Sequence, residues 1–210
     1  MCPRDPRYTE DLGMANKRVV VTFVGLPGSG KSMAADMIKR MGFEVIELGD
    51  IWRELLKKNH ISRDDPIGTR EFTRRIRDKE GKDVYARYAY MKIQKNREKI
   101  AIMGIRSTYE INYLKTKLHN IYIIALLAPL KLRFGRLKHR GKPEDPKTLK
   151  SFRWLEQREK RGFMKAKSEE KHGVMNIIKD ADYVIANTST VKKLRTNVTK
   201  VIKEIERKNG

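Results

Sequence analysis

The sequence has a single cysteine, a shortage of acidic residues and no long hydrophobic run. Its only cysteine is Cys2, so no disulfide can form within the chain, and we expect a reducing, cytoplasmic location. No apolar stretch approaches the ~20 residues of a membrane-spanning helix and no signal-peptide core follows Met1, so no membrane partner is expected. The 210 residues suffice for one α/β domain with an insertion or two, and they indicate no oligomeric state.

The shortage of acidic residues leaves a large positive charge. Lys and Arg number 48 against 26 Asp and Glu, a formal net charge of +22. A charged surface of the kind found in proteins from hot environments would explain many lysines, but it predicts a balance of ion pairs that this composition lacks. Contact with a polyanion, above all RNA or a ribosomal particle, is the other interpretation.

The positive charge is concentrated in two segments. Residues 129–172 carry 15 Lys and Arg against 6 Asp and Glu, and residues 191–210 carry 7 against 2. The first segment also contains Phe152, Trp154 and Phe163. These aromatic rings either pack helices against one another or stack on unpaired bases.

A glycine-rich motif follows the first apolar segment. Residues 25–32 spell Gly-Leu-Pro-Gly-Ser-Gly-Lys-Ser, which matches the phosphate-binding pattern G-x-x-x-x-G-K-S. Residues 18–24 before it are apolar and β-branched, as in a buried parallel strand, and a helical repeat of apolar residues follows until Gly42. The residues expected to contact the ligand are Gly25, Pro27, Gly28, Ser29, Gly30, Lys31, Ser32 and Met33.

The chemistry of this motif predicts a nucleoside triphosphate. Backbone N–H groups of the loop and the following helix N-terminus attract phosphate. Lys31 can reach the β- and γ-phosphate oxygens, and the Ser32 hydroxyl can take one position on Mg²⁺. We therefore expect ATP and Mg²⁺ as cofactors.

The rest of the chain alternates between apolar strands and helical patterns. Five strands separated by helices predict a parallel sheet covered by helices on both faces. Their expected positions are residues 18–24, 43–48 (ending at Gly49-Asp50), 100–103, 121–127 and 183–186. Asp65-Pro66-Ile67-Gly68 and Gly81 are expected to break the helical pattern of the long second connection.

The chain divides into an arm and one domain with two long connections. Residues 1–17 contain prolines, charges and a glycine and are expected to form a flexible N-terminal arm, while 18–210 form the domain. Within it, residues 51–97 and 141–180 are too long for plain crossovers. In a phosphotransferase such segments bind the acceptor and close over the site as a lid, so we assign an acceptor-binding insert and a basic lid.

Together these motifs resemble a known family. Besides the loop, the resemblance is carried by residues 48–54 (LGDIWRE), 104–107 (GIRS), 133–137 (RFGRL), 145–147 (DPK) and 181–187 (ADYVIAN). The chain resembles small P-loop nucleotide kinases, and among them an uncharacterised archaeal family related to adenylate kinase and dephospho-CoA kinase. The resemblance spans about residues 18–205. It implies the fold of a nucleoside monophosphate kinase and transfer of the ATP γ-phosphoryl group to a nucleotide acceptor.

The resemblance also implies roles for residues around the acceptor. Asp50 looks like the acid that holds Mg²⁺-bound water near the phosphates, or alternatively the N-cap of the following helix. Arg53 and Arg106 look like the pair that grips the acceptor phosphate, for which a guanidinium fork is well suited. Arg77 and Arg87 are weaker candidates for the same contact.

The remaining implied residues flank the lid. Arg133, Arg136 and Arg140 are spaced to share one helix face, where Arg136 and Arg140, with Lys31 and Arg106, could stabilise charge on the transferring phosphoryl group. Arg158 could join from the far side of the lid. Asn187 follows the fifth strand, where related enzymes contact adenine.

One residue departs from the family pattern. Related kinases carry an acid at the end of the third strand, where this chain has Met103, whose thioether is a weak, soft acceptor. Three functions therefore remain open. The protein could be a nucleotide kinase with reduced activity, a P-loop ATPase or kinase that acts on RNA or a ribosomal particle, or a nucleotide-binding protein without turnover.

Overall fold

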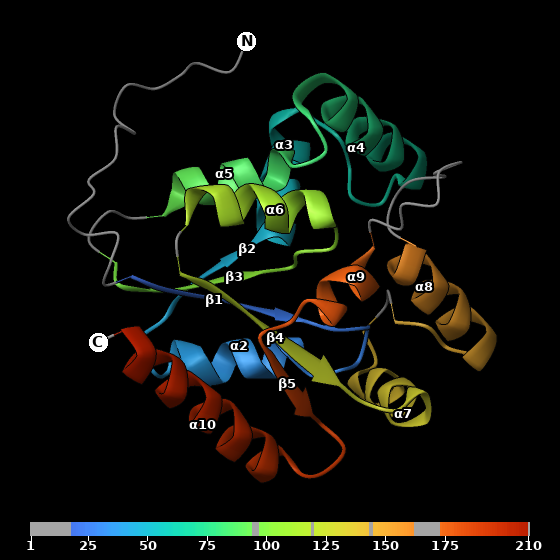
Figure 1. The fold of residues 1–210 in the computed structure, drawn as a ribbon. Helices are drawn as coiled ribbons and strands as arrows, with labels where there is room; N and C mark the ends of the chain where they lie inside the picture. Colours follow the sequence, from blue (N-terminus) through green and yellow to red (C-terminus); the bar gives the residue numbers. More distant parts are fainter. Residues whose placement is uncertain (1–17, 94–96, 119, 143–144, 162–172, 210) are drawn as a thin grey trace.

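The structure, a computed structural model, describes residues 18–93, 97–118, 120–142, 145–161 and 173–209 (Figure 1). The predicted flexible arm at 1–17 and Phe163 therefore lie outside the described residues. In the described parts, no helix has both the length and the apolar character that a membrane span requires. The strands are β1 (Val19–Val24), β2 (Glu44–Glu47), β3 (Lys99–Met103), β4 (Ile121–Leu127) and β5 (Tyr183–Ala186).

The five strands form one parallel sheet in the order β2-β3-β1-β4-β5. All six residues of β1 are buried because this strand is central and both of its faces are covered. The predicted five-stranded parallel sheet is confirmed. Since all strands run the same way, their carboxyl ends meet at one edge, where α/β proteins place their ligands.

Helices complete the domain, and their labels follow Figure 1. They are α2 (Lys31–Lys39), α3 (Leu48–Lys58), α4 (Pro66–Glu80), α5 (Val84–Lys92), α6 (Thr108–Lys117), α7 (Leu130–Arg140), α8 (Leu149–Arg161), α9 (Val174–Lys179) and α10 (Val191–Asn209).

The two faces of the sheet carry separate hydrophobic cores. Val21 and Phe23 of β1 pack with α2 and α10 on one face. Val20 and Val24 point to the opposite face and pack with α3, α5, α6 and α9. This division follows from the alternation of side chains along a strand, and Figure 1 shows the two helical layers above and below the sheet.

Parts of the predicted insert and lid belong to the layers that cover the sheet, while their roles stay predictions. Apolar residues of α3 and α5, such as Leu56 and Ala89, belong to the sheet-covering core, and so does Ile177 of α9. These helices lie in the predicted insert (51–97) and lid (141–180), yet they cover the sheet because their apolar stripes face it. What extends beyond the sheet layers is α4 on one side and α7 with α8 at the carboxyl edge (Figure 1).

Two element boundaries also differ from the prediction. Gly49 and Asp50 do not end the second strand, because α3 begins at Leu48 and contains both. Glu47 is the N-cap, so the alternative role of Asp50 as an N-cap is wrong. The expected breaks near Asp65 and at Gly81 are present, but the first lies before Pro66, which begins α4. Asp65 caps this helix, and its carboxylate accepts hydrogen bonds from Ile67 N (3.0 Å) and Gly68 N (2.9 Å).

Candidate active site

The phosphate-binding loop lies at the carboxyl edge of the sheet, between β1 and α2. Gly28 and Gly30 have positive φ angles of 79° and 106°, which favour glycine. A Cβ on Gly28 would lie 2.5 Å from the Arg133 carbonyl oxygen, and one on Gly30 would lie 2.5 Å from Asn187 Nδ2. These glycines therefore allow both the curl of the loop and the close approach of α7 and of the residue after β5.

Lys31 lies inside this loop. Its Nζ donates hydrogen bonds to the carbonyl oxygens of Gly25 (2.6 Å) and Leu26 (3.2 Å). Burial lowers the pKa of Lys31 to about 8, and the Glu159 carboxylate opposes this shift. Ser32 and Met33 are exposed in the first turn of α2, where the positive end of the helix dipole favours an anion. Residues 25–33 thus form a continuous loop and helix start, and their contact with a ligand stays a prediction.

The loop after β3 presents Arg106 to this site. The backbone N–H groups of Arg106 and Ser107 donate to Glu110 Oε2 (2.8 and 3.1 Å), and Ser107 Oγ accepts from Glu110 N to complete a capping box. Burial raises the pKa of Glu110, while these backbone N–H groups and the Arg77 guanidinium act in the opposite direction. Arg77, predicted to bind acceptor, instead lies 3.6 Å from the buried Glu110 carboxylate.

Helix α8 places an acidic residue against Arg106. Arg106 Nη1 donates to Glu159 Oε1 over 3.1 Å. Glu159 also contributes to the electrostatic surroundings of Lys31, so its carboxylate acts on both cations that are predicted to bind phosphate. A carboxylate at this point occupies a position suited to an anionic ligand.

Two arginines of α7 hold the phosphate-binding loop. Arg133 is buried, and its guanidinium donates to the carbonyls of Ala128 (2.8 Å) and Pro27 (3.2 Å) and to Glu156 Oε1 (2.6 Å). Arg136 donates to Asn187 O (2.9 Å) and Gly28 O (3.4 Å). Their predicted contacts with the transferring phosphoryl group stay predictions, since both guanidinium groups here bind protein carbonyls of or beside the loop.

Asn187 joins the end of β5 to the same loop. Its Nδ2 donates to Ser29 O over 2.8 Å, and its Oδ1 accepts from Arg136. Its backbone N–H bonds to Leu127 O (2.7 Å), which extends the pairing of β4 and β5 by one residue. Asn187 thus reaches the predicted nucleotide site, where its side chain positions the loop, while a contact with adenine stays a prediction.

The other predicted lid residues lie farther along α7 and α8. Arg140 forms an ion pair with Asp145, including a hydrogen bond of 2.8 Å from its Nε, and so fixes the turn after α7. Arg158 is exposed and lies over the Trp154 ring, 5.1 Å from its centroid. Phe152 is fully buried and packs against Phe134, which supports the packing interpretation of that ring, whereas Trp154 is 63% exposed.

The predicted acceptor residues are divided between two places. Asp50 and Arg53 form an exposed ion pair on the first turns of α3, close to the carboxyl edge. Arg87 instead binds the Glu80 carbonyl and lies 3.9 Å from Asp83, where it stabilises the turn between α4 and α5. Arg106 lies on the loop after β3 and Arg53 on α3, whereas Arg77 and Arg87 bind groups that hold neighbouring elements. Contact of any of these four residues with an acceptor stays a prediction.

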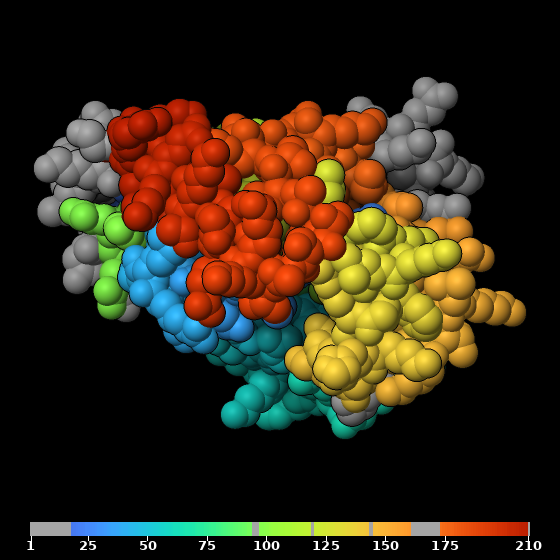
Figure 2. Space-filling model, turned by 90° about the horizontal axis from the view of Figure 1, so that it is seen from below, coloured from blue at the N-terminus to red at the C-terminus, as the bar shows by residue number. Residues whose placement is uncertain are grey.

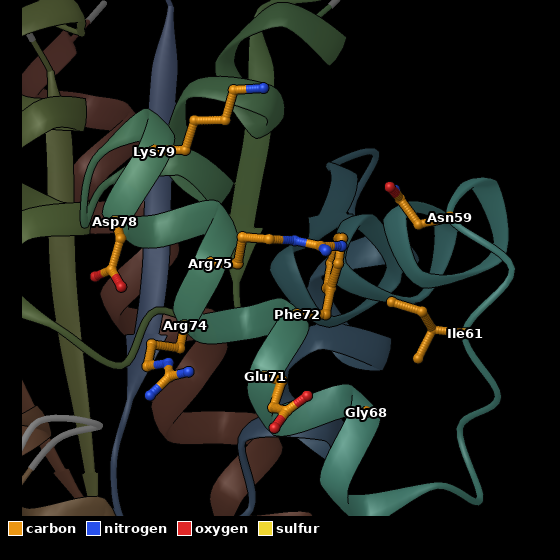
Figure 3. A pocket seen from close by; sticks show the side chains of 9 residues that line it. All are labelled: Asn59, Ile61, Gly68, Glu71, Phe72, Arg74, Arg75, Asp78 and Lys79. Atoms are coloured by element: carbon orange, nitrogen blue, oxygen red, sulfur yellow. The ribbon is translucent and has the colours of Figure 1, made fainter.

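A pocket of about 800 Å³ lies between the end of α3 and α4 (Figure 3). Figure 3 shows the Arg75 side chain extending over Phe72, and the guanidinium carbon lies 5.9 Å from that ring centroid. None of the predicted acceptor arginines lines the pocket. Its walls are Asn59, Ile61, Gly68, Glu71, Phe72, Arg74, Arg75, Asp78 and Lys79.

The oxygen donors at the carboxyl edge fit Mg²⁺. Ser32 presents a hydroxyl, Asp50 a carboxylate on α3, and Glu47 a second carboxylate at the end of β2. Magnesium prefers oxygen ligands and is usually held by one or two carboxylates together with phosphates and water. Within the described ranges, no three His, Cys, Asp or Glu side chains gather into a metal cage.

Sequence reasoning missed the acidic residues of the site. These residues are Glu47, Glu110, Glu156 and Glu159. Glu110 carries a local sequence signal, because Ser107-x-x-Glu110 is a capping box, whereas the other three carry none. Glu156 and Glu159 meet arginines 23 and 53 residues away. Glu47 is a single charge in a short strand.

Comparison with known proteins supports this assignment of fold and loop. A family model described as an AAA domain matches residues 21–178. A UPF0200 protein from Sulfurisphaera tokodaii is 33% identical over 187 residues, and the match covers 89% of this chain and 97% of the relative. A UPF0200 protein from Pyrococcus horikoshii is 31% identical over 192 residues, and the match again covers 89% of this chain and 97% of the relative.

Solved structures show the same fold. TT1252 from Thermus thermophilus has a TM-score of 0.60 at 16% identity over 89% of this chain and 97% of its own. A shikimate kinase from Acinetobacter baumannii in complex with shikimate has a TM-score of 0.53 at 14% identity, and the match covers 89% of this chain and 94% of the kinase. The fold is that of a P-loop kinase, and by sequence the chain belongs to the UPF0200 family of AAA-type P-loop proteins.

Proposed function

We propose that this protein binds ATP with Mg²⁺ and transfers the γ-phosphoryl group to a nucleotide-type acceptor, as adenylate kinase or dephospho-CoA kinase does. The observation that carries the proposal is the electrostatic coupling of Lys31, in the phosphate-binding loop, to Arg106 and to the Glu159 carboxylate that Arg106 binds. Two cations close enough to influence each other electrostatically suit the negative charge of a phosphoryl group in transfer.

The donor and acceptor have separate places in this arrangement. The loop, Lys31 and the α2 N-terminus form the donor side, while Arg106 and Arg53 approach from β3 and α3. Lys31 would neutralise charge on the donor phosphates, and the arginine forks would orient the acceptor phosphate. When bound, Mg²⁺ would neutralise further charge on the β- and γ-phosphate oxygens.

Helix α8 accounts for the exclusion of water during transfer. It is docked on α7 through the buried Arg133–Glu156 pair and through Phe152. An incoming phosphate would displace the Glu159 carboxylate from the Arg106 guanidinium group, so that one anion replaces another there. The exchange leaves α8 over the site, where it shields the phosphates from solvent.

The test is a transfer screen with γ-³²P-ATP and Mg²⁺ across nucleoside monophosphates, dephospho-CoA and RNA. We expect a labelled product with a nucleotide acceptor, and a much lower rate in Arg106→Ala with ATP affinity retained. Arg87→Ala is the matched control, because Arg87 binds the Glu80 carbonyl instead of facing the loop. ATP binding without transfer to any acceptor would favour a nucleotide-binding protein without turnover.

A second candidate function, action on RNA or a ribosomal particle, is favoured by the surface of α10. Figure 2 shows this helix exposed along one face of the molecule, beside α7. Exposed cations follow it from end to end: Lys192, Lys193, Arg195, Lys200, Lys203, Arg207 and Lys208. These cations are more than one transferring phosphoryl group can contact, and a row of them suits the phosphate backbone of a nucleic acid.

The salt dependence of RNA affinity tests this candidate. Changing Lys192, Lys193 and Arg195 to Gln should flatten the slope of log K against log[salt] by about two units, at about 0.7 per single-stranded contact. The same charge change at Lys57, Lys58 and Arg70, which are exposed on α3 and α4, should leave the slope unchanged. An unchanged slope in the α10 variant would leave the charge as a surface property.

A further inference from the structure

Glu47 ends β2 directly beside the residue that ends β3. The two strands are parallel, and Glu47 pairs with Met103 in their register. Ile46 and Leu48 point into the core under α3, whereas Met103 packs in the core under α2. Because side chains alternate along a strand, Glu47 and Met103 lie on the same face of the sheet, which is the face of Lys31 and α2.

The Glu47 carboxylate extends across the edge of β3. A Cβ built on Gly104 would lie 3.3 Å from Glu47 Oε2, so the carboxylate lies just above that glycine. Gly104 has a φ of 82°, and its lack of a side chain leaves the space that the carboxylate uses. The carboxylate therefore lies where a side chain at position 104, directly after β3, would otherwise reach.

The surroundings of Glu47 are those of a functional group. In the parts of the chain that the structure describes, no hydrogen bond or ion pair engages its carboxylate. Burial raises its pKa, and Asp50 adds to the shift, while Arg53, Arg106 and Lys31 oppose it. A half-buried carboxylate on the Lys31 face of the sheet, with no hydrogen-bond or ion-pair partner, is costly unless it serves a ligand.

Asp50 is less suited to the same task. Its side chain is 60% exposed, and Arg53 is its ion-pair partner. Glu47 is half-buried and faces the loop without such a partner.

We propose that Glu47 is the carboxylate that faces Mg²⁺ and its water ligands at the triphosphate, acting from β2 in the place that Met103 leaves apolar on β3. This inference rests on the proposed binding of Mg²⁺ and ATP. It assigns the metal-side role to Glu47 and leaves Asp50 to position Arg53 for the acceptor. Carboxylate oxygen is a ligand type that Mg²⁺ and its water shell prefer.

The test compares ATP affinity with Mg²⁺ and with EDTA by calorimetry in the wild type and in Glu47→Gln. The Gln side chain keeps the shape and removes the charge. We expect metal-free ATP affinity within about twofold of the wild type, and a gain from Mg²⁺ that is smaller by about tenfold or more, the usual effect of removing a group that supports a metal site. Glu44→Gln, at the other end of the same strand, should behave as the wild type.

A second readout needs no turnover. Mn²⁺ replaces Mg²⁺, and its binding to the protein–ATP complex is followed by the enhancement of water proton relaxation. The affinity for Mn²⁺ measured in this way should fall by a similar factor in Glu47→Gln. Adding Met103→Asp to Glu47→Gln should restore most of the metal effect, because it returns a carboxylate to the same face of the sheet. A side chain with a merely structural role would not be rescued from the neighbouring strand.

Each result bears on the inference. Equal gains from Mg²⁺ in the wild type and Glu47→Gln would overturn it and leave the proposed function standing. Loss of metal-free ATP binding in a folded Glu47→Gln would also overturn it, because the residue would then shape the loop. A wild type whose ATP binding ignores Mg²⁺ would overturn the proposed function and this inference with it.

Discussion

The proposed donor and acceptor sides of the site are built in different ways. On the donor side, Arg133 and Glu156 form an ion pair in which both side chains are less than 10% exposed, and Asn187 ties β5 to the loop. On the acceptor side, the Asp50–Arg53 pair is open to solvent and Arg106 is about half exposed. The donor side is thus fixed before ligand arrives, whereas the acceptor side can exchange its partners.

The largest expected effect comes from breaking the donor side. Arg133→Ala should lower the free energy of unfolding by about 3–5 kcal/mol, because it leaves the Glu156 carboxylate buried with one fewer cation. Chemical denaturation measures this loss. In the double variant Arg133→Met with Glu156→Leu, which removes both charges, much of the stability should return, and a loss as large as in the single variant would mean that packing dominates.

Removing Lys31 should separate binding from folding. Lys31→Ala is expected to lower ATP affinity by about a hundredfold, since hydrogen bonds to charged groups contribute about 1.5–3 kcal/mol each. The melting temperature should not fall, because a buried charge is removed. Calorimetry and thermal unfolding of one sample check both, and unchanged ATP affinity in the folded variant would refute the proposed loop chemistry.

The lowered pKa of Lys31 predicts opposite pH effects on binding and stability. ATP affinity should fall as pH rises above about 8, by up to about tenfold per unit, because Lys31 loses the proton that attracts phosphate. Between pH 8 and the ordinary pKa of lysine the unfolded chain binds more protons, so the contribution of Lys31 to the free energy of unfolding rises with pH. Lys31→Ala should lose both dependences, and a wild-type affinity independent of pH from 7 to 9.5 would contradict the assignment.

The smallest expected effect lies on the acceptor side. Arg53→Ala should change the free energy of unfolding by less than about 1 kcal/mol, because its pair with Asp50 is exposed to solvent. It should nevertheless raise the KM for the acceptor found in the transfer screen. Chemical denaturation measures the change in stability. A loss of unfolding free energy in Arg53→Ala as large as that in Arg133→Ala would contradict the difference in rigidity between the two sides.

The sheet and the loop could be predicted from sequence, because their signals are local. Residues 121–127 and 183–186 are apolar runs, and the loop motif specifies its own backbone geometry. The start of α3 could not be predicted, since Gly49-Asp50 resembles a turn, although an acid also suits the first turn of a helix. Asp65-Pro66 was ambiguous for the same reason, because its residue types both break and begin helices.

The partners of the arginines could not be predicted. Arg133 and Arg140 resemble phosphate-binding residues in a basic segment, and only the folded chain brings Glu156 and Asp145 to them. A count of cations indicates a basic region but not which of its arginines have acidic partners within the protein. Arg77 and Glu110 show the same limit, because their contact joins α4 to the loop after β3.

The contact between Arg106 and Glu159 has a consequence for selectivity. Any ligand that reaches this guanidinium competes with a carboxylate that is tethered to the chain and always present at high local concentration. A free carboxylic acid offers the same charge and the same bonds without that tether, so it competes poorly. A phosphate dianion brings more charge and more acceptor oxygens. If Arg106 binds the acceptor phosphate as proposed, we expect α8 to favour phosphorylated ligands over organic acids.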